Sequence, residues 1–378
     1  MNFYALIFFN VFNHSVFVGS RVAVSLYAIS LDASPFTVGT LMSVYGVVPM
    51  LFSVSAGRLA DRVGPRLPML AGSVLVVLGA VTPFLFPGLH ALYAAAVVIG
   101  TGFMVYQVTL QNIVGFIGKR EDRPTNFSVL ALGFSFSAFV GPVLTGLAID
   151  WGGYRIAFLM LAFLPLAGIA VLAANKLPLP RPPAHGARSG ERRLADLFAH
   201  RELRGIFIIS GVQSMAWELF SFMMPIYGSR IGLSASIIGV VMASFAVATF
   251  LVRLALPLLA RRLTAWRMLS FALLASGFTY LLFPLVTNVA MLMALAFVLG
   301  IGLGGSQPMV MALLHDAVPE GRTGEAVGLR ATVVTTSQTF MPLLFGALGS
   351  TLGVAPAFWA VAIALAAGSR VAKKRRAP

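Results

Sequence analysis

Glu218 is the one acidic residue that falls clearly inside a long apolar stretch of this sequence. It lies on a polar stripe with Ser210 and Ser214, because residues four and eight positions apart share one side of a helix. A carboxyl group buried in a low-dielectric medium favours its neutral form unless a cation offsets it, so Glu218 is a candidate proton carrier. The alternative is an ion pair with Arg21 that locks two helices together, and the sequence leaves both hypotheses open.

A second polar stripe lies in the first apolar stretch, where Asn10, Asn13, His14 and Arg21 recur at helical spacing. Polar side chains at membrane depth cost free energy, and for that reason they usually serve a function. His14 is a second titratable candidate, and the alternative for it is a neutral histidine hydrogen-bonded across a helix interface. Further candidate contacts to a small-molecule solute are Gln107, Gln111, Gln213, Trp217 and Gln307.

The composition requires a lipid environment around these residues. The chain has 378 residues, of which 58% are hydrophobic and 10% are charged, whereas soluble proteins are about half apolar and about a quarter charged. The net charge of +15 lies in short clusters between apolar stretches, which argues against a nucleic-acid partner. Cysteine is absent, so there is no thiolate metal site, and we expect no metal or cofactor.

Twelve stretches are long enough for spanning helices, which need about 20 mostly apolar residues. They are residues 3–30, 37–59, 67–87, 90–117, 127–149, 155–175, 204–229, 235–260, 267–287, 290–314, 325–349 and 353–370. The sequence therefore predicts an all-α membrane protein.

The Lys and Arg residues gather in the connections after every second stretch and in the C-terminal tail. Cytoplasmic loops carry the excess of these residues, so both termini and residues 176–203 are predicted to be cytoplasmic, in a bacterial inner membrane. Arg253 and Arg330 lie inside apolar stretches near their cytoplasmic ends, and we interpret both as packing or latch residues.

The chain repeats itself after 200 residues. Matches that apolar composition does not explain include Gly100/Gly300, Gln107/Gln307, Pro142/Pro342 and Gly153/Gly353. Parallel repeats of six spans are typical of one transporter architecture. The predicted units are a six-helix bundle at 1–175, a cytoplasmic linker at 176–203, a second bundle at 204–370 and a basic tail at 371–378.

The connection after the second stretch reads GRLADRVGPR and contains Gly57, Asp61, Arg62, Gly64 and Arg66. It resembles the loop signature G-x-L-a-D-r-x-G-r-[KR] of the major facilitator superfamily. The acid between two glycines, at a predicted helix end, suits a latch that holds the cytoplasmic side in one of two states. The alternative is that the charges only obey the positive-inside rule.

A second motif, Gly141-Pro142 with Gly146, resembles the G-P-x-x-G-G signature of the drug-antiporter branches. Thr145 stands where the first of the paired glycines belongs. The motif indicates either export or a Gly-Pro kink that serves packing. Ala96 occupies the position at which proton-coupled exporters of the superfamily usually carry an arginine, so coupling must use other groups or be absent.

The resemblance implies twelve helices in two pseudo-symmetric halves, with helices 1, 4, 7 and 10 lining a central cavity. It implies a secondary active transporter, not an enzyme, which acts by alternating access in the lipid bilayer. We expect proton-coupled efflux of a small solute by a monomer. The alternatives are import of a small organic acid or other nutrient, a non-transporting sensor, and a membrane-embedded enzyme. A nucleotide-driven pump is excluded, since no G-x-x-x-x-G-K-[ST] motif occurs.

Overall fold

The structure is a computed structural model that describes residues 3–114, 117, 123–176, 179, 200–259, 264–318 and 323–374. These residues form helices joined by short connections, and no strand occurs among them. Most of the predicted linker and the last four residues of the predicted tail lie outside the described residues.

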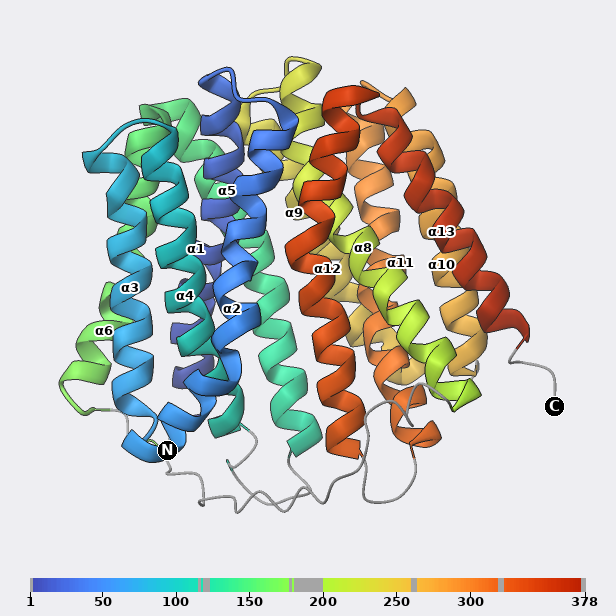
Figure 1. The fold of residues 1–378 in the computed structure, drawn as a ribbon, viewed down its shortest axis with the longest axis horizontal. Helices are drawn as coiled ribbons and strands as arrows, with labels where there is room; N and C mark the ends of the chain where they lie inside the picture. The colour runs from blue at the N-terminus through green and yellow to red at the C-terminus, as the bar shows by residue number, and fades with distance from the viewer. Residues whose placement is uncertain are drawn as a thin grey trace.

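The long helices stand side by side and run from one end of the bundle to the other, from top to bottom in Figure 1. They are α1 (Phe3–Ser30), α2 (Pro35–Val63), α3 (Arg66–Leu85), α4 (Leu89–Val114), α5 (Arg123–Phe163), α6 (Leu166–Ala173), α8 (Arg201–Arg230), α9 (Ala235–Leu259), α10 (Ala265–Leu282), the short 3-10 helix η2 (Phe283–Leu285), α11 (Val289–Ala317), α12 (Thr323–Thr351) and α13 (Ala355–Lys374).

Eleven segments in the described part of the chain are long and apolar enough to cross a membrane. One of them, Thr125–Ala173, holds two of the twelve predicted spans. Within α5 the chain breaks at Gly153, where a φ of 77° suits glycine alone, and α6 then completes the second crossing. Gly353, with a φ of 84°, makes the equivalent break between α12 and α13. The predicted all-helical membrane fold is confirmed.

The 200-residue repeat reappears in the packing. A Cβ added to Gly100 would meet the carbonyl oxygen of Tyr45, and one added to Gly300 would meet that of Phe245. In the same way, Gly102 packs on the backbone at Gly72, and Gly302 on that at Ala272. Each half therefore builds its interior from the same glycine-on-carbonyl contacts.

Two long contacts join the halves, and we call them seams. In the α5–α9 seam Gly239 packs on the carbonyl of Pro142, and Gly146 packs on that of Ala235. In the α2–α12 seam Gly39 packs on the carbonyl of Pro342, and Gly346 packs on that of Pro35. Glycine at these positions lets the helix backbones approach closely, as in other membrane helix pairs.

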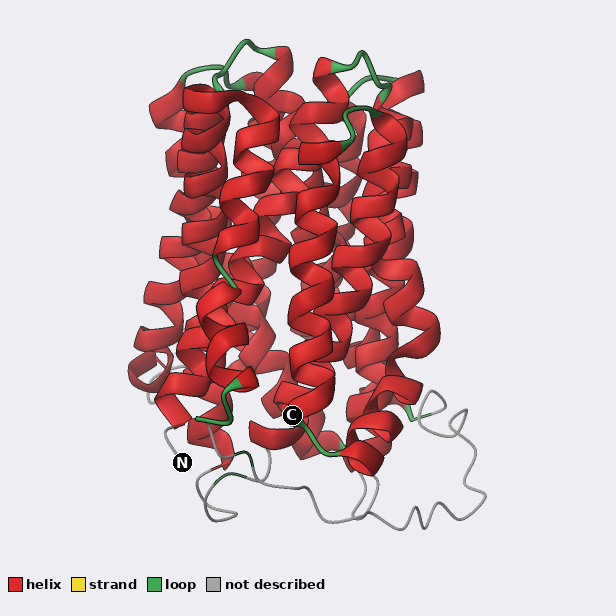
Figure 2. Cartoon of the chain, turned by 90° about the vertical axis from the view of Figure 1, so that its left-hand side faces the viewer, coloured by secondary structure: helices red, strands yellow, loops and turns green. Residues whose placement is uncertain are grey.

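The two ends of the bundle differ. Both termini lie at its lower end in Figures 1 and 2, which we call the terminal end; the other is the opposite end. At the opposite end, the Asp150 carboxylate on α5 accepts the backbone N–H groups of Ala235 (3.2 Å) and Ser236 (2.9 Å). Ser350 Oγ on α12 accepts the N–H of Phe36 at 3.0 Å. Towards the terminal end, α2 and α12 diverge (Figure 1).

Candidate functional site

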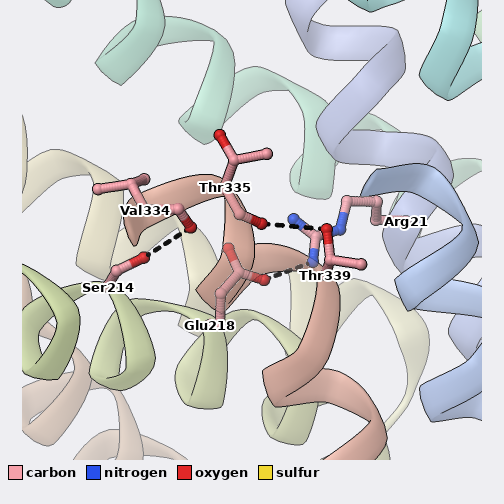
Figure 3. Close-up of polar contacts among 6 residues, drawn as sticks. All are labelled: Arg21, Ser214, Glu218, Val334, Thr335 and Thr339. Carbon is pink, nitrogen blue, oxygen red and sulfur yellow. Dashed lines mark hydrogen bonds and ion pairs between the residues drawn. The ribbon is translucent and has the colours of Figure 1, made fainter. Parts of the chain in front are cut away.

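An ion pair lies between α1 and α8. Arg21 Nη2 donates to Glu218 Oε2 at 2.7 Å, with side-chain exposures of 17% and 2%. Figure 3 shows both side chains beside α12, near Thr335 and Thr339. The pair therefore joins the first half of the chain to the second.

Burial makes this pair costly to break. Two charges removed from water are stable only together, and removal of one partner leaves an uncompensated buried charge at a cost of about 3–5 kcal/mol. The sequence predicted such a pair as one of two roles for Glu218, and the structure brings the two residues together. Whether Glu218 also carries a proton stays a hypothesis.

The polar stripe of α1 is buried and largely unsatisfied. Asn10 is 0% exposed, and neither its Nδ2 nor its Oδ1 has a hydrogen-bond partner in the described structure. The same holds for Asn13 Oδ1 and His14 Nδ1. The His14 ring lies among aromatic rings, with centroids 4.8 Å from Phe134 and 5.5 Å from Phe103. Buried polar groups without partners are uncommon, so this stripe is a candidate contact for water or a solute.

Two predicted contacts lie on α4 in different environments. Gln107 Oε1 is buried without a partner among the described residues, whereas the Gln111 side chain is exposed. Only Gln107 therefore adds an unsatisfied group to those on α1.

On α8, Gln213 Nε2 donates to the carbonyl of Leu303 at 3.1 Å, and its Oε1 finds no described partner. Trp217 packs edge-on against Phe245, with ring centroids 4.8 Å apart. Gln213 therefore fixes its position through one end of the amide and keeps the other end available.

The position of Gln307 on α11 leads to a residue that the sequence analysis did not place in the site. Gln307 Oε1 accepts from Arg253 Nη2 at 3.0 Å. Arg253 Nη1 donates to the Ala131 carbonyl (3.0 Å) and to Ser135 Oγ (2.8 Å) on α5. Arg253 therefore links both halves. Its position inside an apolar stretch was the signal in the sequence, but its partners became visible only in the fold.

The loop motif at the terminal end is partly described. Gly64 adopts a φ of 84° and its N–H caps α2 through the Ala60 carbonyl. Arg66 donates to the carbonyls of Leu172 (2.7 Å) and Ala173 (2.5 Å), and so caps the end of α6. Arg62 is exposed, and a Cβ on Gly57 would make an ordinary 3.6 Å contact with Val108.

Asp61 lies in α2 by its backbone, but its side chain is outside the described part of the structure. The latch therefore stays a prediction, although Arg66 does tie the motif to a second helix.

The second motif lies where helices meet. A Cβ on Gly141 would come within 2.8 Å of the Ser15 carbonyl on α1, and Pro142 and Gly146 belong to the α5–α9 seam. These three residues thus pack α5 against both halves of the chain.

Comparison with known proteins places these observations in a family. The model of the Major Facilitator Superfamily matches residues 3–281 and 206–373. The chain is 25% identical over 321 residues to the class G tetracycline resistance protein of Vibrio anguillarum, covering 82% of this chain and 80% of that protein. It is 33% identical over 131 residues to a di-/tripeptide transporter of Lactobacillus helveticus, but this match covers only 26% of that protein.

Solved structures share the fold. A POT family transporter in complex with 5-aminolevulinic acid matches with a TM-score of 0.80 at 16% identity, covering 98% of this chain and 94% of that chain. The nucleoside transporter NupG matches with a TM-score of 0.77 at 12% identity over the full length of both chains.

Proposed function

Because the chain belongs to the Major Facilitator Superfamily, we propose that this multi-pass membrane transporter exports a small solute in exchange for protons. The observation that carries the proposal is the buried ion pair of Arg21 and Glu218. Glu218 is a titratable group at membrane depth. Its pair with Arg21 joins the two halves of the chain, which must move relative to each other in alternating access.

The pair suits a coupling switch. A proton that binds Glu218 neutralises the carboxylate, which removes the attraction that holds Arg21 and loosens α1 from α8. Loss of the proton restores the contact. Ala96, which is fully buried, replaces the arginine that proton-coupled drug exporters of the superfamily usually carry. Arg21 and Glu218 would therefore provide the proton coupling in its place. Solute contacts come from the unsatisfied polar groups of Asn10, Asn13 and Gln107.

The proposal extends to orientation and partners. With both termini in the cytoplasm of a bacterium, the opposite end of the bundle faces the periplasm. The tight contacts there correspond to a state that is closed towards the outside, and the loop motif with Asp61 latches the cytoplasmic side in the other state. The likeness to a tetracycline resistance protein supports export. One chain, with bundles at 1–175 and 204–370, is the transporting unit.

The test uses purified protein in proteoliposomes with an imposed pH gradient and a pH-sensitive dye inside. Tetracycline, a dipeptide, 5-aminolevulinic acid and a nucleoside serve as probes. We expect a transported probe to dissipate the gradient in the wild type. Glu218→Gln mimics the protonated side chain, so it should retain counterflow exchange of the probe and lose the proton movement.

The double variant separates the two hypotheses for Glu218. If the pair is only a gate, Arg21→Gln with Glu218→Gln should recover the proton-driven transport that each single change loses. If Glu218 carries the proton, the double variant should fold normally and stay uncoupled. Full proton-driven transport in Glu218→Gln alone would show that the pair has no role in coupling and would leave His14 as the next candidate.

Import of a small organic acid is the second candidate function. One observation favours it: within the described structure Arg253 donates only to uncharged oxygens. The same liposomes, loaded in reverse, distinguish import from export by the direction of the gradient that drives probe accumulation.

A further inference from the structure

Arg21 and Arg253 are both cations at membrane depth, but they are balanced differently. Arg21 is paired with a carboxylate at 2.7 Å. The three bonds of Arg253 go to a backbone carbonyl, a hydroxyl and an amide oxygen, and none of its partners in the described part of the chain is acidic. Neutral partners satisfy donors without compensating the charge, so the cost of burying this charge is only partly offset.

The guanidinium of Arg253 extends into the membrane rather than out of it. Arg253 lies about 9 Å along the axis from the end of α9 at Leu259. Its partner Gln307 lies about 15 Å from the end of α11 at Ala317, and Ser135 lies about 18 Å from the start of α5 at Arg123. A long basic side chain near a helix end normally extends to the membrane surface. This one extends the other way.

One edge of the guanidinium remains incompletely bonded. Arginine has five N–H donors in a planar fork, whose Nε and Nη2 edge matches the two oxygens of a carboxylate or phosphate. Arg253 Nε has no partner within the described residues. Nη2 is held by the exposed amide of Gln307, which an incoming oxygen can displace without leaving a buried group unsatisfied.

We propose that the transported solute carries an anionic oxygen group, a carboxylate or a phosphate, and that Arg253 binds it from this edge. The inference rests on the transport function proposed above and holds for either direction of transport. A bound anion supplies the missing countercharge, and the same cation repels positively charged solutes, so the site selects by charge.

Binding at this position also acts on the α5–α9 seam. Arg253 holds Ala131 and Ser135 of the first half while it is fixed to the second. An anion that draws the guanidinium towards itself competes with these two bonds. Solute occupancy is thereby linked to the contact between the halves, since a ligand shifts an equilibrium only through unequal affinity for its states.

The test measures binding, not flux, in detergent-purified full-length protein without a pH gradient. A thermal-shift library pairs small carboxylic acids and phosphate monoesters with their neutral amides and esters, and affinities are then measured for each stabilising pair. The expected outcome is that anions bind the wild type at least about tenfold more tightly than their neutral counterparts, as is usual for a charged hydrogen bond. The acids and the phosphate monoesters form separate arms that identify the oxygen group.

Arg253→Gln should abolish the preference for the anion over its neutral counterpart, a ratio that a purely structural role would leave unchanged. If that variant does not fold, Arg253→Lys serves instead. It keeps the positive charge but loses the planar set of guanidinium donors, so it should reduce the ratio of the affinity for the anion to that for its neutral counterpart. Arg155→Gln is the matched control, since Arg155 donates to the Phe84 carbonyl at the opposite end. Three outcomes would overturn the inference. In the first, only neutral or cationic compounds stabilise the protein; in the second, none of the anions in the library binds. In the third, both Arg253 variants keep the wild-type ratio of affinities. Because no gradient is used, failure of proton coupling would not affect this result.

Discussion

The two seams are built alike at the opposite end and differently further along. In both, glycines of one half pack on carbonyls of the other. The α5–α9 seam is tied again by Arg253, which bonds to Ala131 and Ser135. The equivalent position in the α2–α12 seam is Ser53, which makes no hydrogen bond to α12 among the described residues. The α5–α9 seam is therefore joined by side-chain hydrogen bonds beyond its glycine contacts. The α2–α12 seam makes a further close contact between Gly46 and Thr339 and then diverges towards the terminal end (Figure 1).

The difference leads us to a hypothesis: the repeat supplies the packing, and the residues that depart from the repeat supply the proposed transport function. A contact repeated in both halves holds the bundle together in a symmetric way. On this hypothesis, a residue present in one half only, such as Arg253 or Glu218, marks a place where the two halves have different roles. The α2–α12 seam is accordingly the one that we expect to open first at the terminal end.

Disulfides across the seams should have the largest effect. The natural chain contains no cysteine, so the pairs Phe36→Cys with Ser350→Cys and Asp150→Cys with Ser236→Cys can be oxidised cleanly. If the opposite end must open during the cycle, either disulfide should stop transport completely, and a reductant should restore it. The single-cysteine variants serve as controls. Continued transport by fully cross-linked protein would show that these ends stay closed.

Glycine substitutions should show that the seams are equal in packing. A Cβ at Gly146 or Gly346 would collide with a backbone carbonyl, of Ala235 and Pro35 respectively. Gly146→Ala and Gly346→Ala should each lower the free energy of unfolding by about 1–3 kcal/mol, the usual cost of overpacking. Thermal unfolding in detergent measures it, with Gly57→Ala as the tolerated control. A large effect in one seam alone would contradict the symmetric packing.

The side chains of Asp150 and Ser350, which cap a helix start of the other half and which we call the end caps, should give the smallest and most unequal effects when they are removed. Asp150 accepts two backbone N–H groups and Ser350 accepts one. We expect Asp150→Ala to cost about 1–2 kcal/mol and Ser350→Ala about 0.5–1 kcal/mol, in the range of helix N-caps. Thr351→Ala is the control, because its hydroxyl bonds only within α12. If Asp150→Ala and Ser350→Ala lowered the free energy of unfolding by the same amount, the two seams would not differ in the strength of their caps.

Much of the fold was predictable because membrane helices leave a strong signal. The apolar stretches and the paired glycines and prolines follow from the lengths and close approaches that a bilayer imposes. The pair of Arg21 and Glu218 was foreseen as one hypothesis, since buried charges need partners.

Other parts of the site had no signal of this kind. The backbone carbonyl of Ala131 that Arg253 contacts has no residue type to reveal it. The caps were missed for a different reason: Asp150 and Ser350 are exactly one repeat apart, yet their side chains differ, so a comparison of identical residues passes over them.

The cross-half caps have a consequence for the order in which the protein is made. Asp150 precedes Ser236, whose N–H it accepts, by 86 residues. The carboxylate that caps α9 is therefore already in the membrane when α9 is synthesised. The N–H of Phe36, in contrast, is accepted by Ser350, which is synthesised 314 residues later. During translation the start of α2 therefore stays without this acceptor until nearly the whole chain exists. A chain cut into two co-expressed halves should supply each cap in trans, and neither half alone should complete its helix ends.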